Sequence, residues 1–139
     1  MDNYLPHTNS YVRLKPSSIP GAGIGVFAIK EIPKNTIVFQ FDNSEIKWIK
    51  KEDISELDPE VQEMYKHFAV EKDGMLGAPK HFNQMTPAWY INHSYNPNCG
   101  CDKNYDFYTL RDIKKGEELT VDYSSYSSDV AKVLKFSEF

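Results

Sequence analysis

The chain has 139 residues, and its 16 basic and 20 acidic residues give a formal net charge of −4. This length fits one domain, and a composition with 40% hydrophobic and 14% aromatic residues argues against disorder. The mildly acidic balance shows no sign of the basic face that direct nucleic-acid binding requires, and it weakly favours a basic peptide partner.

Two exclusions concern the location of the protein. No apolar run in the sequence approaches the roughly 20 residues that a membrane helix needs, so we expect no membrane contact. The N-terminus lacks the basic and apolar regions of a secretory signal peptide. We therefore expect a soluble intracellular protein, with nothing that favours nucleus over cytoplasm.

The N-terminal third of the chain predicts short strands. Residues 1–10 are polar, and we expect them to be flexible. Alternation of apolar and polar residues predicts a strand at 11–15, and β-forming residues predict two more at 26–29 and 36–41.

Residues 43–86 have a different character. The charged stretch 47–56 predicts a short helix, and a second helix should begin at Pro59 with Asp58 as its N-cap. Its apolar residues fall at i, i+3, i+4 and i+7, which makes one core-facing stripe: Val61, Met64, Tyr65 and Phe68. Residues 72–74 predict a hairpin turn.

The C-terminal part predicts strands at 107–111 and 119–123, a serine-rich loop at 124–128 and a short helix within 131–139. Many short strands with little helix indicate a mostly β domain, of the β-rich α+β class.

The most unusual stretch is residues 89–98, which joins two aromatic residues, an Asn-His pair and an Asn-Pro-Asn turn. Asn92 and His93 carry donors and acceptors suited to a polar ligand. Taken alone, the stretch equally fits a structural turn with a buried histidine. Asn92 to Ser94 also matches a glycosylation sequon, although the sequence shows no signal peptide.

Three segments, in this order, resemble the SET domain of lysine methyltransferases. They are the glycine motif at 23–25, the Asn-His-Ser and Pro-Asn signature at 91–98, and the segment 116–123 that ends in a tyrosine. The resemblance implies a SET domain over 11–126 with a variable insert at 43–86. Residues 127–139 would then be a short C-terminal segment that packs on the domain.

The SET resemblance implies several small sheets, a helical insert and a threaded C-terminal segment that passes near the Asn-His motif. It also implies S-adenosylmethionine as cofactor and Tyr123 as the catalytic residue. The cofactor-binding residues that it implies are Gly23, Ile24, Gly25, Asn92, His93 and Tyr123. A tyrosine hydroxyl beside the transferring methyl group can orient a lysine amine. His93 as a general base is the alternative that we rank below a structural role.

The same resemblance implies a lysine channel, for which the candidate residues are Phe41, Tyr95, Cys101, Val121 and Tyr126. Two of these residues depart from the family pattern. Phe41 stands where many members have a tyrosine, and Val121 stands where many have an aromatic residue that tunes methylation. The number of methyl groups added therefore cannot be predicted.

Cys99 and Cys101 form half of a zinc-binding pattern, but no second cysteine pair exists, so we expect no metal. The leading hypothesis is S-adenosylmethionine-dependent methyl transfer to a lysine of a protein or peptide. Histones are the best-known substrates of the family that the chain resembles, and nothing in the sequence selects them. The sequence is compatible with a monomer or a homodimer.

Two alternatives from other classes stay open. A SET-fold binding module without turnover would explain the departures at Phe41, Asn43 and Val121, whereas retention of Tyr123 favours an enzyme. A small metal-binding protein that uses Cys99, Cys101 and His93 is a weaker third hypothesis.

Overall fold

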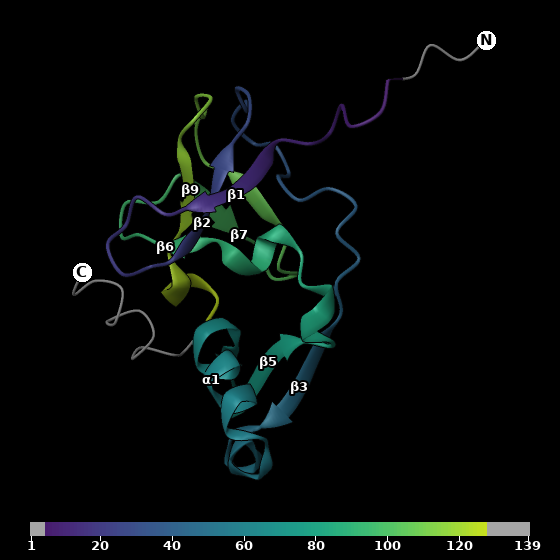
Figure 1. The fold of residues 1–139 in the computed structure, drawn as a ribbon. Coiled ribbons are helices and arrows are strands. Elements are labelled where there is room, and N and C mark those ends of the chain that lie inside the picture. The colour runs from purple at the N-terminus through teal and green to yellow at the C-terminus, as the bar shows by residue number, and fades with distance from the viewer. Residues whose placement is uncertain (1–4, 128–139) are drawn as a thin grey trace.

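The computed structural model describes residues 5–127, which are drawn in colour in Figure 1. Within this range the strands are β1 (Val12–Pro16), β2 (Ile24–Ala28), β3 (Ile46–Lys50), β4 (Val70–Lys72), β5 (Met75–Pro79), β6 (Asn92–His93), β7 (Cys99–Cys101), β8 (Phe107–Thr109) and β9 (Glu118–Val121). The helices are α1 (Pro59–Phe68) and the short 3-10 helices η1 (Lys51–Glu56), η2 (Phe82–Gln84), η3 (Pro87–Tyr90) and η4 (Tyr123–Ser125).

The main sheet has the strand order β1-β2-β9-β6. Strands β1 and β2 are antiparallel, β9 is antiparallel to β2, and β6 runs parallel to β9. This order places the start of the chain, its middle and its last strand side by side (Figure 1). The strands predicted at 11–15 and 26–29 are confirmed to within two residues.

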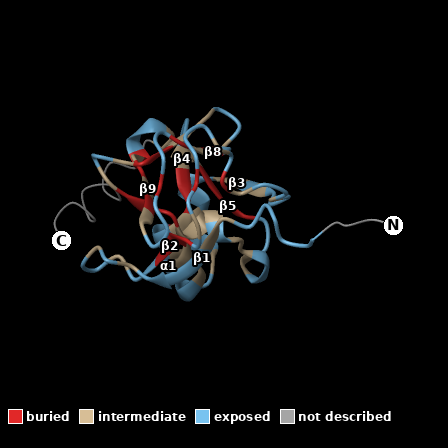
Figure 2. Ribbon diagram, turned by 90° about the horizontal axis from the view of Figure 1, so that it is seen from above, coloured by how far each residue is buried: buried red, intermediate tan, exposed pale blue. Residues whose placement is uncertain are grey.

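The principal core lies against this sheet. Val26 of β2 and Leu119 of β9 have no solvent exposure, and Ile32 pairs with Ile113 through two backbone hydrogen bonds of 2.9 and 2.8 Å. Figure 2 shows the buried segments concentrated in the central strands, with exposed loops around them. Burying such a side chain contributes about 1.5–3 kcal/mol to the stability of the fold. The sheet therefore holds the residues at its strand ends in fixed positions.

The strand predicted at 36–41 is wrong. Ile37 makes an isolated bridge to Tyr108, and the chain then turns, with Asp42 donating its N–H to the carbonyl of Phe39. Phe41 has a φ of 63°, which an extended strand does not allow. The carboxylate of Asp42 accepts a hydrogen bond from Thr86, and this contact draws the chain out of the extended conformation.

A second unit contains the sheet β3-β5-β4 and helix α1 (Figure 1). It has its own cluster of buried residues, formed by Tyr65, Ala69, Leu76 and Ala78. The predicted cap is confirmed, since Asp58 accepts a hydrogen bond from the N–H of Glu60 at 2.9 Å. The predicted turn at 72–74 joins β4 to β5.

The helix predicted at 47–56 is half right. The stretch begins as β3, which pairs with β5, and it becomes helical only at η1. Gly77 explains the pairing, because a Cβ there would lie 2.8 Å from the ring of Trp48. Packing of Trp48 on the bare backbone of Gly77 therefore overrides the local helical tendency.

Several small sheets with few helices confirm the mostly β fold class. Strand β9 ends at Val121, two residues earlier than predicted, and Tyr123 opens η4 instead. The predicted terminal helix at 131–139 lies outside the described residues. Among the helices from residue 5 to residue 127, none is long and apolar enough to cross a bilayer.

Candidate active site

Strand β6 is short, and the side chain of Asn98 joins its segment to β9. Asn98 Nδ2 donates to the carbonyl of Glu118 and its Oδ1 accepts from the N–H of Thr120, both at 2.8 Å. The chain bends at 95–96 and again at Asn98, and the amide of Asn98 lies buried beside β9. Asn92 and His93 consequently lie in register with Thr120 and Val121.

Tyr123 follows directly after β9, where Asp122 caps η4 by accepting from the N–H of Ser124 at 3.0 Å. This turn directs the ring inward, and the residue is 7% exposed. Its hydroxyl donates to the carbonyl of Ile91 at 2.6 Å. Burial raises the pKa of the phenol, and the negative charge of Glu118 raises it further. The hydroxyl is therefore protonated near neutral pH.

The imidazole of His93 is held in one tautomer. Its Nδ1 accepts a hydrogen bond from the backbone N–H of Tyr123 at 3.0 Å, so the ring proton must sit on Nε2. Nε2 is fully enclosed and has no hydrogen-bond partner among residues 5–127. Burial lowers the pKa of His93, and Asp122 opposes this effect only in part. His93 is therefore neutral near pH 7, and its 3.8 Å approach to Asp122 is not an ion pair there.

Asn92 lies at the junction of the glycine motif and β9. Its Nδ2 donates to the carbonyl of Ile24 and to the carboxylate of Glu118, each at 3.0 Å. A Cβ at Gly25 would lie 2.3 Å from Glu118 Oε2 and 3.2 Å from Asn92 Nδ2. Position 25 therefore favours glycine, because the side chains of Glu118 and Asn92 occupy the space beside its backbone and would have to shift for a larger residue.

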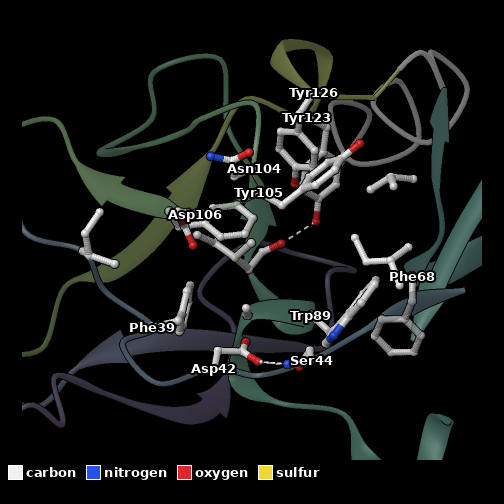
Figure 3. Close-up of a pocket in the computed structure, with 16 residues that line it drawn as sticks. Phe39, Asp42, Ser44, Phe68, Trp89, Asn104, Tyr105, Asp106, Tyr123 and Tyr126 are labelled. Atoms are coloured by element: carbon white, nitrogen blue, oxygen red, sulfur yellow. Dashed lines mark hydrogen bonds between the residues drawn. The ribbon is translucent and has the colours of Figure 1, made fainter. Parts of the chain in front are cut away.

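A cavity of about 150 Å³ opens beside Tyr123 (Figure 3). Its walls are mainly aromatic and apolar, and they come from the loop before β3, from β3, the end of α1, β4, η3, β8 and η4, and from the segments next to them. The cavity is lined by Ile37, Phe39, Asp42, Ser44, Ile46, Phe68, Val70, Ala88, Trp89, Ile91, Asn104, Tyr105, Asp106, Phe107, Tyr123 and Tyr126. Two carboxylates and no Lys or Arg stand among these residues, so the lining favours a cationic or neutral guest.

The aromatic rings of this cavity pack edge to face. Tyr126 meets Tyr123 at 6.1 Å and Phe107 at 5.7 Å between ring centroids, and Phe107 meets Phe39 at 5.6 Å. Such pairs fix ring positions as well as contributing about 0.5–1.5 kcal/mol each. The cavity is therefore bounded by rings that hold one another in place.

The predicted cofactor residues lie together. Gly23, Ile24 and Gly25 lead into β2, and Asn92 and His93 are one strand away on the other side of β9. Tyr123 contacts His93 through its backbone and its ring, whose centroid is 5.2 Å from the imidazole centroid. The structure brings these segments to one place even though up to 100 residues separate them in sequence.

The predicted channel residues are more scattered. Tyr126 lines the cavity, but Phe41 is 82% exposed and does not line it. Tyr95 is 62% exposed and packs edge to face on His93. Val121 is buried in the core, and Cys101 lines a separate hollow that shares only Tyr105 and Tyr126 with the cavity.

Sequence reasoning missed Glu118 and most of the cavity wall. Trp89 lies in the singled-out stretch, and only its place beside the Asn-His pair gave a signal. Phe39 and Phe107 lie in stretches whose β-forming residues predict strands, and strand propensity does not indicate a cavity wall. Nothing in the sequence distinguishes Glu118 from the adjacent Glu117, which forms a surface ion pair with Arg111 at 2.9 Å.

The two cysteines lie apart from this chemistry. Burial raises the pKa of the Cys99 and Cys101 thiols to about 12, so neither is a thiolate at neutral pH. From residue 5 to residue 127 no group of three or more His, Cys, Asp or Glu side chains is placed to hold a metal ion. The geometry thus gives no support to the metal-binding hypothesis.

Comparison with known proteins decides the family. The family model for the SET domain matches residues 23–124, which include the glycine motif, the Asn-His strand and Tyr123. The chain belongs to the SET domain family. The recognition drawn from the three sequence segments is confirmed.

Relatives of this SET domain are named as histone-lysine N-methyltransferases. Histone-lysine N-methyltransferase SETD7 of Halocynthia roretzi is 24% identical over 144 residues, which cover 89% of this chain. A histone-lysine N-methyltransferase of Schizosaccharomyces pombe, H3 lysine-36 specific, is 30% identical over 110 residues and 73% of this chain. The SET domain chain spans 34% of the length of the first relative and 13% of the second.

Solved structures show the same fold. A Plasmodium falciparum protein described as a histone methyltransferase matches 82% of this SET domain chain and 93% of its own chain, with a TM-score of 0.51 and 22% identity. A chain of a humanized Chaetomium thermophilum Polycomb Repressive Complex 2 matches 88% of this chain and 16% of its own, with a TM-score of 0.59 and 21% identity.

Proposed function

We propose that this SET domain transfers a methyl group from S-adenosylmethionine to a lysine side chain of a protein. The observation that carries the proposal is the position of Tyr123. Its hydroxyl is bonded to the carbonyl of Ile91 at the wall of the aromatic cavity. The backbone N–H of Tyr123 donates a hydrogen bond to His93. His93 is adjacent to Asn92, which is hydrogen-bonded to the glycine motif.

The residues beside the glycine motif suit the cofactor. Asn92 presents both of its amide hydrogens to protein acceptors, and no donor among the described residues reaches its Oδ1. That oxygen can accept a hydrogen bond from the ammonium group of the cofactor's amino-acid end. Asn92, the backbone of His93 and the residues 23–25 would hold S-adenosylmethionine, which supplies an activated methyl group on a cationic sulfur.

The cavity suits the alkyl stem of a lysine. Aromatic walls such as Phe39, Phe107 and Trp89 exclude water, and an apolar setting lowers the pKa of an amine that enters it. The neutral amine is the nucleophile that methyl transfer requires. Asp106, which is exposed at the cavity, favours approach of the charged form from solvent.

Tyr123 acts on the amine as a positioning hydroxyl rather than as a base. Because its pKa is raised, the phenol keeps its proton and donates a hydrogen bond to the carbonyl of Ile91. The same oxygen can accept a hydrogen bond from an amine N–H, and this contact would aim the nitrogen lone pair at the methyl group. A histone is the substrate that the names of the relatives support.

The test measures transfer of labelled methyl groups from S-adenosylmethionine to a histone mixture, followed by hydrolysis to identify methyl-lysine. We expect labelling by the wild type and a loss of about 100-fold in Tyr123→Phe, because one preorganised polar contact is removed. Tyr65→Phe is the matched control, since Tyr65 lies in the separate cluster under α1. It should leave labelling unchanged.

Two results would contradict the proposal. Equal labelling by Tyr123→Phe and the wild type would remove Tyr123 from the reaction. Binding of S-adenosylmethionine without transfer to any histone would favour the alternative of a binding module.

A further inference from the structure

Glu118, at the start of β9, connects segments that are far apart in the sequence. Its carboxylate accepts hydrogen bonds from Ser17 Oγ at 2.7 and 3.0 Å, from Ser18 N at 3.0 Å and from Ser18 Oγ at 2.7 Å. It also accepts from Asn92 Nδ2 at 3.0 Å. The loop after β1, strand β6 and strand β9 thus meet at one side chain.

Every partner of this carboxylate is neutral. From residue 5 to residue 127, no Lys, Arg or His side chain forms an ion pair with Glu118. The adjacent Glu117 differs in this respect, because its charge is balanced by Arg111. Glu118 therefore keeps an uncompensated negative charge within the group of residues that includes Gly25 and Asn92.

The charge of Glu118 also determines how the amide of Asn92 is turned. Both neighbours of Asn92 Nδ2, the Ile24 carbonyl and the Glu118 carboxylate, are acceptors only. A flipped amide would place oxygen against two oxygens, so Nδ2 must face inward. Oδ1 then faces away from Glu118, and no donor among residues 5–127 reaches it. It is not fully enclosed, because His93 Nε2 is the one fully enclosed polar side-chain atom of these residues that lacks a partner.

We propose that Glu118 is a positioning residue for the amino-acid end of the cofactor. It holds Asn92 with Oδ1 outward, where that oxygen accepts a hydrogen bond from the α-ammonium group, and its own charge favours the same cation. This inference rests on the proposed function, because it assumes that Asn92 lies in the cofactor site. It adds a residue that selects the ammonium group of the ligand.

The experiment compares two ligands on two proteins by calorimetry. The ligands are S-adenosylhomocysteine and its deaminated analogue, which differ only in the α-ammonium group. We expect the wild type to bind S-adenosylhomocysteine about 10-fold more tightly than the analogue, as a charge-assisted hydrogen bond predicts. In Glu118→Gln this preference should fall to within about 2-fold, because the negative charge is removed and only the Ile24 carbonyl still orients the amide of Asn92.

If the role of Glu118 is purely structural, Glu118→Gln would weaken the binding of both ligands equally and leave the ratio of their affinities unchanged. The matched control is Glu117→Gln, which removes a neighbouring carboxylate whose partner is Arg111 and should leave the ratio at its wild-type value. An unchanged ratio in Glu118→Gln, or a wild-type ratio near one, overturns the inference while the proposed function stands. No binding of S-adenosylhomocysteine to the wild type overturns both.

A second variant keeps the test valid if Glu118→Gln alone is poorly folded. Glu118→Asp keeps the negative charge and the acceptor oxygens on the side chain that faces Asn92 Nδ2. It should keep a preference of more than about 2-fold for S-adenosylhomocysteine over the deaminated analogue. A folded Glu118→Asp protein that binds the two ligands equally contradicts the inference.

Discussion

The backbone N–H of Tyr123 donates to Nδ1 of His93 at 3.0 Å, so the position of the candidate catalytic residue depends on an uncharged imidazole. A protonated Nδ1 is a donor and cannot accept this bond. His93 therefore serves Tyr123 as a structural support, which agrees with the ranking of that role above a general base. The same relationship makes the fold sensitive to acid.

The first prediction concerns pH. Burial lowers the pKa of His93 in the folded chain below the unfolded value of about 6.5. Above about pH 6.5 the imidazole of His93 is neutral in both the folded and the unfolded chain, and its contribution to stability is fully present. As the pH falls below that value the unfolded chain takes up a proton first, so the free energy of unfolding decreases until the folded pKa is passed. Urea denaturation at about pH 7.5 and about pH 5.5 measures the loss.

In His93→Asn the loss between the two pH values should be smaller, because the amide oxygen can still accept from Tyr123 and does not titrate. His81→Gln is the control, since His81 is exposed and should leave the loss unchanged. Glu117, whose pKa the Arg111 hydrogen bond lowers, acts only at more acidic pH. The prediction fails if wild type and His93→Asn lose equal stability.

The second prediction concerns Asn98. Asn98→Ala removes one donor and one acceptor from β9 and leaves the Thr120 N–H and the Glu118 carbonyl without these partners. We expect the free energy of unfolding to fall by about 2–6 kcal/mol, at about 1–3 kcal/mol for each of the two unsatisfied buried groups. Chemical denaturation measures the change. Asn96 is exposed, so Asn96→Ala should stay within about 0.5 kcal/mol of the wild type. A similarly small change in Asn98→Ala would show that the hydrogen bonds of Asn98 to β9 do not stabilise the fold.

The third prediction concerns contact between Gly25 and Glu118. Gly25→Ala should destabilise the chain by about 1–3 kcal/mol, because the new Cβ would lie 2.3 Å from Glu118 Oε2. Adding Glu118→Ala makes room for it, so the double variant should lose less stability than the sum of the single changes. Thermal or urea denaturation of the four proteins measures this coupling.

Gly74→Ala combined with Glu118→Ala is the control for this cycle. Gly74 lies in the turn between β4 and β5, and no atom lies within 4 Å of its Cβ position. The two changes should add to within about 0.5 kcal/mol. Strict additivity for Gly25 and Glu118 would mean that the close packing does not restrict position 25.

Local sequence signals predicted the elements that are stabilised locally. The cap at Asp58, the helix after it and the hairpin turn at 72–74 all follow from short-range chemistry. The stretch 36–41 misled because β-forming residues need a partner strand, and β8 offers only three residues. The stretch that contains Trp48 was predicted to be helical but forms a strand, because its partner Gly77 lies far along the chain.

The site was predictable where a motif marks it and not elsewhere. Asn92, His93 and Tyr123 were singled out from ordered motifs, and the structure brings them into contact. Phe41 and Glu118 show the limit of this reasoning. Whether a phenylalanine lines a cavity or stands in solvent, and whether a glutamate pairs with an arginine or an asparagine, depends on tertiary contacts.

Calorimetric titration of S-adenosylmethionine into the wild type, Asn92→Ala and Asn96→Ala tests whether the cofactor binds where Asn92 meets the glycine motif. We predict saturable binding to the wild type and to Asn96→Ala, and a loss of about 10-fold or more in Asn92→Ala, whose amide lies against Glu118 and the glycine motif. Equal binding by Asn92→Ala and the wild type, or no binding by the wild type, would contradict a cofactor site at this junction.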